Sequence, residues 1–99
     1  MIYRDLEKVR VMLKEATELD IAYAYDDLVF PEYTAFIIQY AESNDTDFSC
    51  YFHEDCLPES KTGILENLMV TFKEHGCAIV SKGNFKLKQK GEEVEIAFS

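Results

Sequence analysis

The sequence predicts an α+β fold in which two helices cover one face of an antiparallel β-sheet, in the order α-β-β-β-α-β-β. Apolar residues recur at helical spacing in two segments, at the start of the chain and again around residues 60–75. Between these segments, and after the second, apolar residues alternate with a period of two. Because the 99 residues are 47% hydrophobic and contain few Gly or Pro, one domain over residues 1–99 is expected.

The first helix is expected to extend to about Glu18, with charged residues on the side opposite its apolar stripe. The stripe consists of Ile2, Leu6, Val9, Leu13 and Ala16. We expect it to pack on the sheet beside the second helix, with the small residues Ala22 and Ala24 as its seat. The alternative is a homodimer in which part of the stripe, with Met12, meets the same helix of a second copy.

A first strand is predicted where Ile21, Tyr23 and Tyr25 alternate with alanines, and Asp26-Asp27 is typical of a turn. Residues 28–30 precede Pro31, which favours an edge strand or a loop for this segment.

Two further strands are predicted, from about Tyr33 to Ala41 and from Asp47 to His53. Their apolar faces match, so we expect them to pair as an antiparallel hairpin. The matching residues are Phe36, Ile38 and Tyr40 on the first strand and Phe48, Cys50 and Phe52 on the second.

The second helix is expected from about Pro58 to His75, ended by Gly76, with a buried stripe of Ile64, Leu65, Leu68, Met69 and Phe72. Residues 78–80 begin the next strand, and the chain closes in a hairpin with Lys90-Gly91 at its tip. The predicted facing pairs are Leu87 with Val94, Phe85 with Ile96, Lys88 with Glu93 and Lys86 with Glu95. These lysines therefore belong to a paired, solvated face, which argues against a nucleic-acid stripe.

Charge is distributed unevenly along the chain. Between Lys14 and Lys61 there is no Lys or Arg, while 12 carboxylates and five of the six tyrosines lie in that stretch. A field of one sign repels nucleic acid and anionic membranes and can steer a basic partner. The acidic N-terminal residues do not resemble a signal peptide, and no apolar run approaches the ~20 residues of a membrane span. A cytoplasmic protein is expected.

Every cysteine and histidine lies in one window: Cys50, His53, Cys56, His75 and Cys77. Zinc would need such ligands on a tetrahedron, but strand alternation turns Cys50 and His53 to opposite faces. A reactive thiolate needs an electropositive setting, whereas Cys56 lies among carboxylates. No metal, cofactor or catalytic residue is therefore expected, and a metal-binding module or small enzyme built on these five residues remains the rival hypothesis.

The sequence favours a small acidic, non-catalytic module that binds a basic surface of another protein, as an inhibitor, an immunity-type protein or a chaperone-like protein would. Tyrosine suits interfaces because it joins a rigid apolar ring to a polar tip. The predicted partner-binding residues are Tyr25, Asp26, Asp27, Glu32 and Tyr33. A nucleic-acid mimic is a further alternative. The element order is similar to that of dimeric type III secretion chaperones, a likeness of fold alone.

Overall fold

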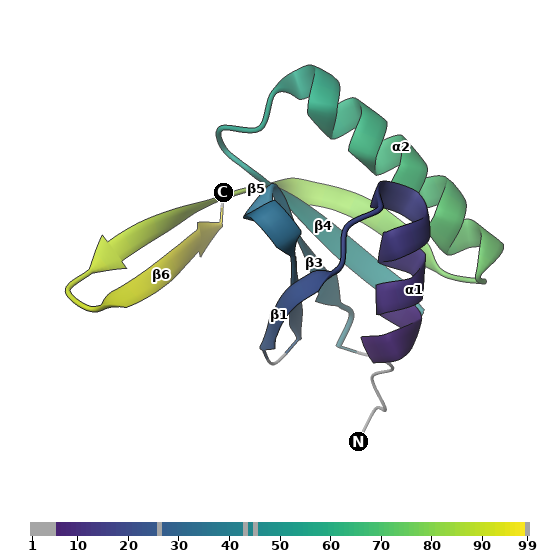
Figure 1. Cartoon of the computed structure of the whole chain (residues 1–99), viewed down its shortest axis with the longest axis horizontal. Helices are drawn as coiled ribbons and strands as arrows, with labels where there is room; N and C mark the ends of the chain where they lie inside the picture. Colours follow the sequence, from purple (N-terminus) through teal and green to yellow (C-terminus); the bar gives the residue numbers. More distant parts are fainter. Residues whose placement is uncertain (1–5, 26, 43, 45, 99) are drawn as a thin grey trace.

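The computed structural model describes residues 6–25, 27–42, 44 and 46–98. Within these residues two α-helices and six strands form a mostly antiparallel α+β fold, so the predicted class is confirmed (Figure 1). In chain order they are α1 (Leu6–Thr17), β1 (Ile21–Tyr25), β2 (Leu28–Pro31), a 3-10 turn η1 (Glu32–Thr34), β3 (Phe36–Tyr40), β4 (Asp47–His53), α2 (Pro58–Glu74), β5 (Ala78–Lys90) and β6 (Glu93–Phe98).

The core lies between the two helices and one face of the sheet. Strands β3 and β4 pair antiparallel, and alternate residues of both point into the core, as predicted. The facing pairs are Phe36 with Phe52, Ile38 with Cys50 and Tyr40 with Phe48. Because this one face collects the large apolar side chains, both helices pack against it.

Each helix buries a narrower stripe than the sequence predicted. Helix α1 buries Val9, Met12 and Leu13, whereas Leu6 is largely exposed and Ile2 lies outside the described residues. Helix α2 buries Leu68, Thr71 and Phe72, and the Phe72 ring meets the ring of Phe48 edge-on with centroids 5.2 Å apart.

Met69 was predicted to be buried but is 48% exposed. The buried residues Leu68 and Phe72 are four positions apart and define the centre of the stripe. Met69 follows Leu68 by one residue and therefore lies about 100° round the helix from it. The predicted seat of α1 is also wrong, because Ala22 and Ala24 are exposed on the edge strand β1 while α1 packs beside α2.

The sheet order β1-β2-β3-β4-β5-β6 contains one strand more before α2 than predicted. Residues 28–31 form β2, an interior strand between β1 and β3, and not the predicted edge strand or loop. Pro31 is tolerated because the β2–β3 ladder ends at Val29, and because the β1–β2 ladder is irregular between Ile21 and Tyr23. The fourth strand also weakens the likeness to type III secretion chaperones.

Strands β4 and β5 pair in parallel, which corrects the prediction of a wholly antiparallel sheet. Helix α2 is the crossover: it carries the chain back along the sheet, so that Ala78 starts beside Asp47. No helix among the described residues is long and apolar enough to cross a membrane.

The closing hairpin has a register two residues away from the predicted one. Leu87 faces Ile96, Lys88 faces Glu95, and Gly91 takes the first turn position with a φ of +62°. A shift of two residues leaves every side chain on its predicted face. Among the described strands, β5 pairs beyond Phe85 with β6 alone, and this two-stranded arm, residues 86–97, projects from the body of the protein (Figure 1).

Replacing Leu13 with Ala is expected to lower the free energy of unfolding by roughly 2–4 kcal/mol, because the side chain is fully buried between α1 and the sheet. The matched control is Val11→Ala on the same helix, where the side chain is 42% exposed and the loss should stay below about 1 kcal/mol. Urea denaturation measures both. Equal losses would contradict the orientation of α1.

Candidate functional site

The predicted partner-binding residues lie at two separate ends of β2. Tyr25 and Asp27 flank the β1–β2 turn, while Glu32 and Tyr33 follow the other end of the strand. Four strand residues span roughly 13 Å, so the two groups do not form one cluster. Asp26 lies outside the described residues. Tyr25 is 65% exposed and Tyr33 88% exposed, so each tyrosine is open to contact from outside.

Two of the predicted carboxylates have structural partners within the chain. The Asp27 carboxylate accepts a hydrogen bond of 2.8 Å from Gln39 Nε2, and its backbone carbonyl accepts one from the Tyr40 N–H. Glu32 Oε1 accepts a hydrogen bond of 2.8 Å from the backbone N–H of Asp20. Both residues therefore hold local structure in addition to supplying negative charge.

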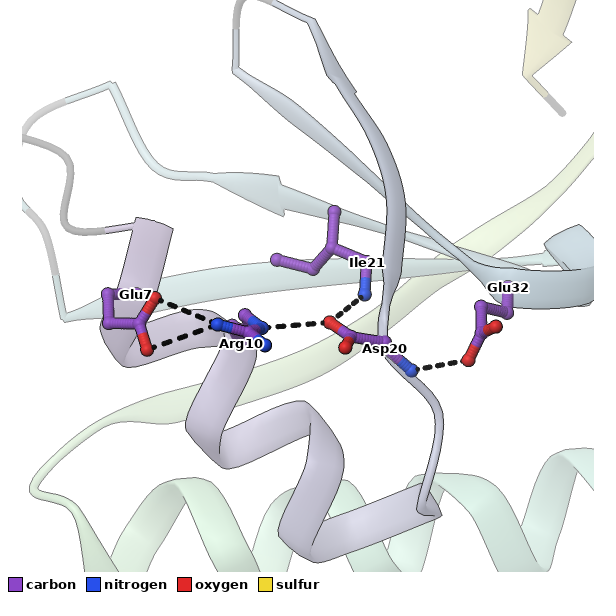
Figure 2. A network of polar contacts seen from close by, with 5 residues as sticks. All are labelled: Glu7, Arg10, Asp20, Ile21 and Glu32. Carbon is purple, nitrogen blue, oxygen red and sulfur yellow. Dashed lines mark hydrogen bonds and ion pairs between the residues drawn. The ribbon is translucent and has the colours of Figure 1, made fainter.

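The Glu32 contact belongs to a polar network that ties α1 to β1 and β2 (Figure 2). Arg10 Nε donates to Asp20 Oδ1 at 3.0 Å, and the Ile21 N–H donates to the same oxygen at 2.8 Å. Glu7 meets the Arg10 guanidinium from the helix at 3.4 Å. Hydrogen bonding from Arg10, and then from Ile21, holds the pKa of the Asp20 carboxyl below its ordinary value. The network fixes the chain immediately before β1 and after β2.

Tyr33 follows directly from this anchored segment and has an unusual backbone. Its φ is +67°, in the left-handed region that a bulky side chain rarely adopts. The backbone N–H of Glu32 donates to the Asp20 carbonyl at 3.0 Å, and β3 begins three residues after Tyr33. These constraints hold the strained backbone and keep the Tyr33 ring outside the core.

Tyr33 lines an open cleft of about 460 Å³ beside the start of α2, which we call the Tyr33 cleft. The walls are mainly apolar or small side chains with a few polar groups. The lining residues are Tyr33, Ala35, His53, Cys56, Leu57, Ser60 and Ile64. The cleft thus joins one predicted partner-binding residue to two of the predicted cysteine and histidine candidates. The sequence did not predict this cleft because its lining residues come from three separate segments: the turn after β2, the turn after β4 and the first residues of α2.

His53 and Cys56 share the cleft, but each is hydrogen-bonded to a nearby backbone group. His53 Nδ1 accepts a hydrogen bond of 3.0 Å from the Asp55 N–H, so the neutral ring carries its proton on Nε2. The ring packs against Phe85 at 5.2 Å. Cys56 Sγ donates to the Leu57 carbonyl at 3.8 Å. These contacts do not aim the imidazole at the thiol as a nucleophilic pair would require.

The remaining cysteine and histidine candidates lie elsewhere. Cys50 is buried in the core on the face opposite His53, as alternation predicted, and burial together with the nearby Cys56 raises the pKa of its thiol to about 12. His75 and Cys77 follow the far end of α2, whose 17 residues span about 25 Å. His75 Nε2 lies 3.0 Å from Glu15 Oε2. Within residues 6–25, 27–42, 44 and 46–98, no three metal-binding side chains come together.

Four carboxylate residues are each adjacent in the chain to a residue that lines the Tyr33 cleft, and we call this set the acidic rim. This acidic rim consists of Glu32, Glu54, Asp55 and Glu59. Glu54, Asp55 and Glu59 are exposed. The nearest base along α2, Lys61, donates from Nζ to Asn84 Oδ1 at 3.0 Å. Apart from Lys61, which follows Ser60, the residues adjacent in the chain to the cleft lining are therefore acidic or uncharged.

The face of the sheet opposite the helices is also apolar, which sequence reasoning missed. Ile37 and Phe85 are almost completely buried there, although the described helices pack on the other face. Aromatic side chains of the same face supply cover: Tyr51 meets Phe98 at 4.4 Å, and Tyr23 meets Phe30 at 5.8 Å. The available signal was the run of apolar residues at 36–38, which is typical of a strand buried on both faces.

Comparison of the chain with protein-family models, curated proteins and solved structures gives no match. The assignment of function therefore depends on the geometry and charge of this chain alone.

Asp20 should contribute to the change of the free energy of unfolding with pH. Because its pKa is lowered on folding, the carboxylate stabilises the protein above its ordinary pKa of 3.8, and this contribution is lost as the pH falls through the lower folded value. Asp20→Asn should therefore be less stable than the wild type at pH 6, and the gap should close toward pH 2–3. Urea denaturation across this range measures it. A gap that widens in acid would contradict the network.

The three thiols should differ in accessibility. In the native protein at pH 8 we expect an aromatic disulfide reagent to modify Cys56 alone, because Cys50 and Cys77 are buried and the Cys50 thiol stays protonated. In denaturant all three should react. Cys56→Ser is the control and should abolish the native reaction. Rapid modification of Cys50 without unfolding would contradict its placement in the core.

Proposed function

We propose that this protein is a small non-catalytic binding module that engages a basic surface of another protein. Lysine or arginine from the partner would enter the Tyr33 cleft. Three features of the cleft support this proposal: its acidic rim, its apolar walls and its exposed tyrosine. Of the residues predicted from the sequence, Glu32 and Tyr33 carry the interaction, and Tyr25 and Asp27 contribute charge and contact area at the other end of β2.

The chemistry of the cleft fits a long basic side chain. Leu57 and Ile64 can cover an aliphatic stem, since Lys and Arg bury their methylene groups while keeping the charged head in water. A cation close to the face of the Tyr33 ring gains roughly 0.5–2 kcal/mol, depending on how far water is excluded. Carboxylates of the acidic rim then receive the head group. The same field repels nucleic acid and anionic membranes, so neither is proposed as a partner.

The observation that carries the proposal is the conformation of Tyr33. Tyr33, a bulky residue that is 88% exposed, is held at a φ of +67° beside a cleft that it helps to line. Backbone strain of this kind costs about 1–3 kcal/mol and tends to occur where a side chain is presented for binding. Inhibitors, immunity-type proteins and chaperone-like proteins are the classes of small acidic protein that fit such a module, and a cytoplasmic location suits each of them.

Affinity capture from a cytoplasmic extract at low salt tests the proposal, with the wild type and Tyr33→Ala as paired baits. A basic protein retained by the wild type and lost from Tyr33→Ala would then be used to measure kinetics. Truncation of a central interface tyrosine is expected to weaken binding by about 2 kcal/mol. Equal retention by both baits would contradict the role of Tyr33.

Neutralising the acidic rim should slow association with that partner. In the triple variant Glu54→Gln, Asp55→Asn and Glu59→Gln, the on-rate at low salt should fall by roughly tenfold, because exposed charges steer encounter. The matched control is Glu66→Gln, Glu74→Gln and Glu92→Gln, which removes three exposed carboxylates away from the cleft. Surface plasmon resonance measures both variants. An on-rate that falls equally in both would indicate net charge and not the cleft.

A further inference from the structure

Among the described residues, no third strand of the same chain pairs with the two-stranded arm. Pairing between β4 and β5 ends at Phe85, so residues 86–90 have β6 as their one neighbour among the described strands. Strand β6 is also the last strand of the sheet, and no described strand pairs with its outer edge. A two-stranded ribbon without further cover is at best marginally stable in water. Pairing with an additional strand would therefore stabilise the arm.

We propose that the arm joins two copies of this chain, with β6 of each copy paired antiparallel and Ile96 on the two-fold axis. The two six-stranded sheets would then become one continuous sheet. A two-fold axis makes the contact self-complementary and closed, so association stops at the dimer. This inference does not rest on the proposed function, because no residue of the arm lines the Tyr33 cleft.

The helix-free face of the arm supports this register. Leu87 faces Ile96 across the β5–β6 ladder, and Leu87 is 44% exposed. With Ile96 on the axis, it faces Ile96 of the second copy. The result is an unbroken apolar row of Leu87, Ile96, Ile96 and Leu87 across four strands, and cross-strand contacts of this kind stabilise a sheet.

The other face of the arm shows matching charge complementarity. Lys88 faces Glu95, whereas Lys86 faces the small residue Ala97. The proposed axis places Glu95 opposite Ala97 of the second copy, with Lys86 of that copy one strand further on. Two strand spacings are about 9.6 Å, a gap that a lysine side chain can reach across over an alanine. Each Glu95 would thus lie between two lysines, one from each copy.

Neighbouring registers are less favourable. Placing the axis midway between two residues shifts the pairing by one residue and would put the apolar face of one copy beside the charged face of the other. Centring it on Glu95 would oppose two carboxylates directly, which destabilises a ladder. Centring it on Ala97 would leave only the last residues of β6 to overlap. Ile96 is the position that keeps a long overlap without opposing like charges.

Sedimentation velocity and native mass spectrometry of the full chain test the dimer. We expect a mass of two chains, and Ile96→Asp should shift the protein to one chain by placing two carboxylates on the axis. The control is Val80→Asp, an exposed valine of β5 outside the arm, which should stay dimeric. Circular dichroism would show that both variants remain folded. A wild type that is monomeric at about 100 μM, or a dimer lost equally in both variants, would overturn the proposal.

Oxidative cross-linking tests the register without depending on a disruptive change. In a Cys56→Ser background, Ile96→Cys should form a disulfide between two chains, because directly facing residues have Cα atoms about 4.5–5.5 Å apart. Leu87→Cys is the matched control on the same face, roughly 14 Å from its counterpart and beyond disulfide reach. Non-reducing electrophoresis measures the cross-linked fraction. Cross-linking of Leu87→Cys and not of Ile96→Cys would overturn the pairing of β6 with β6.

Discussion

The pairing of β3 with β4 sets the orientation of the rest of this protein. With Phe36 beside Phe52 and Tyr40 beside Phe48, alternate side chains of both strands point to one face and make it apolar. A sheet that is apolar on one face has to bury that face against another layer. The stripes of α1 and α2 supply that layer, so both helices lie on the same side.

The position of α2 then decides how the chain can finish. A helix of 17 residues laid along the sheet returns the chain to the end at which β4 began, and β5 must run parallel to β4. Strand β5 is longer than β4 and continues past it, which creates the projecting arm with β6. The arm is therefore a consequence of the crossover, and its stability depends on what meets its outer edge.

The same arrangement separates the cysteines and histidines that the sequence offered as a candidate metal or catalytic site. Strand alternation puts Cys50 and His53 on opposite faces, and the length of α2 carries His75 and Cys77 away from Cys56. What the fold brings together is different: the turn after β2, the turn after β4 and the first residues of α2 converge at the Tyr33 cleft. The acidic rim belongs to the same three segments, and the network around Arg10 and Asp20 fixes the backbone that presents Tyr33.

The features of the fold that depend on patterns of a few residues could be predicted from the sequence itself. Periodicity determined the two helices, the antiparallel pairing of β3 with β4 and the core residues on these strands, because neighbouring segments pair through a short turn. Gly76 has a φ of +75° and ends α2, as expected of a residue that adopts a positive φ without strain. Only tertiary structure decided the interior strand at residues 28–31, the parallel pairing of β4 with β5 and the Tyr33 cleft. Each of these depends on which distant segments become neighbours, and no local propensity encodes that choice.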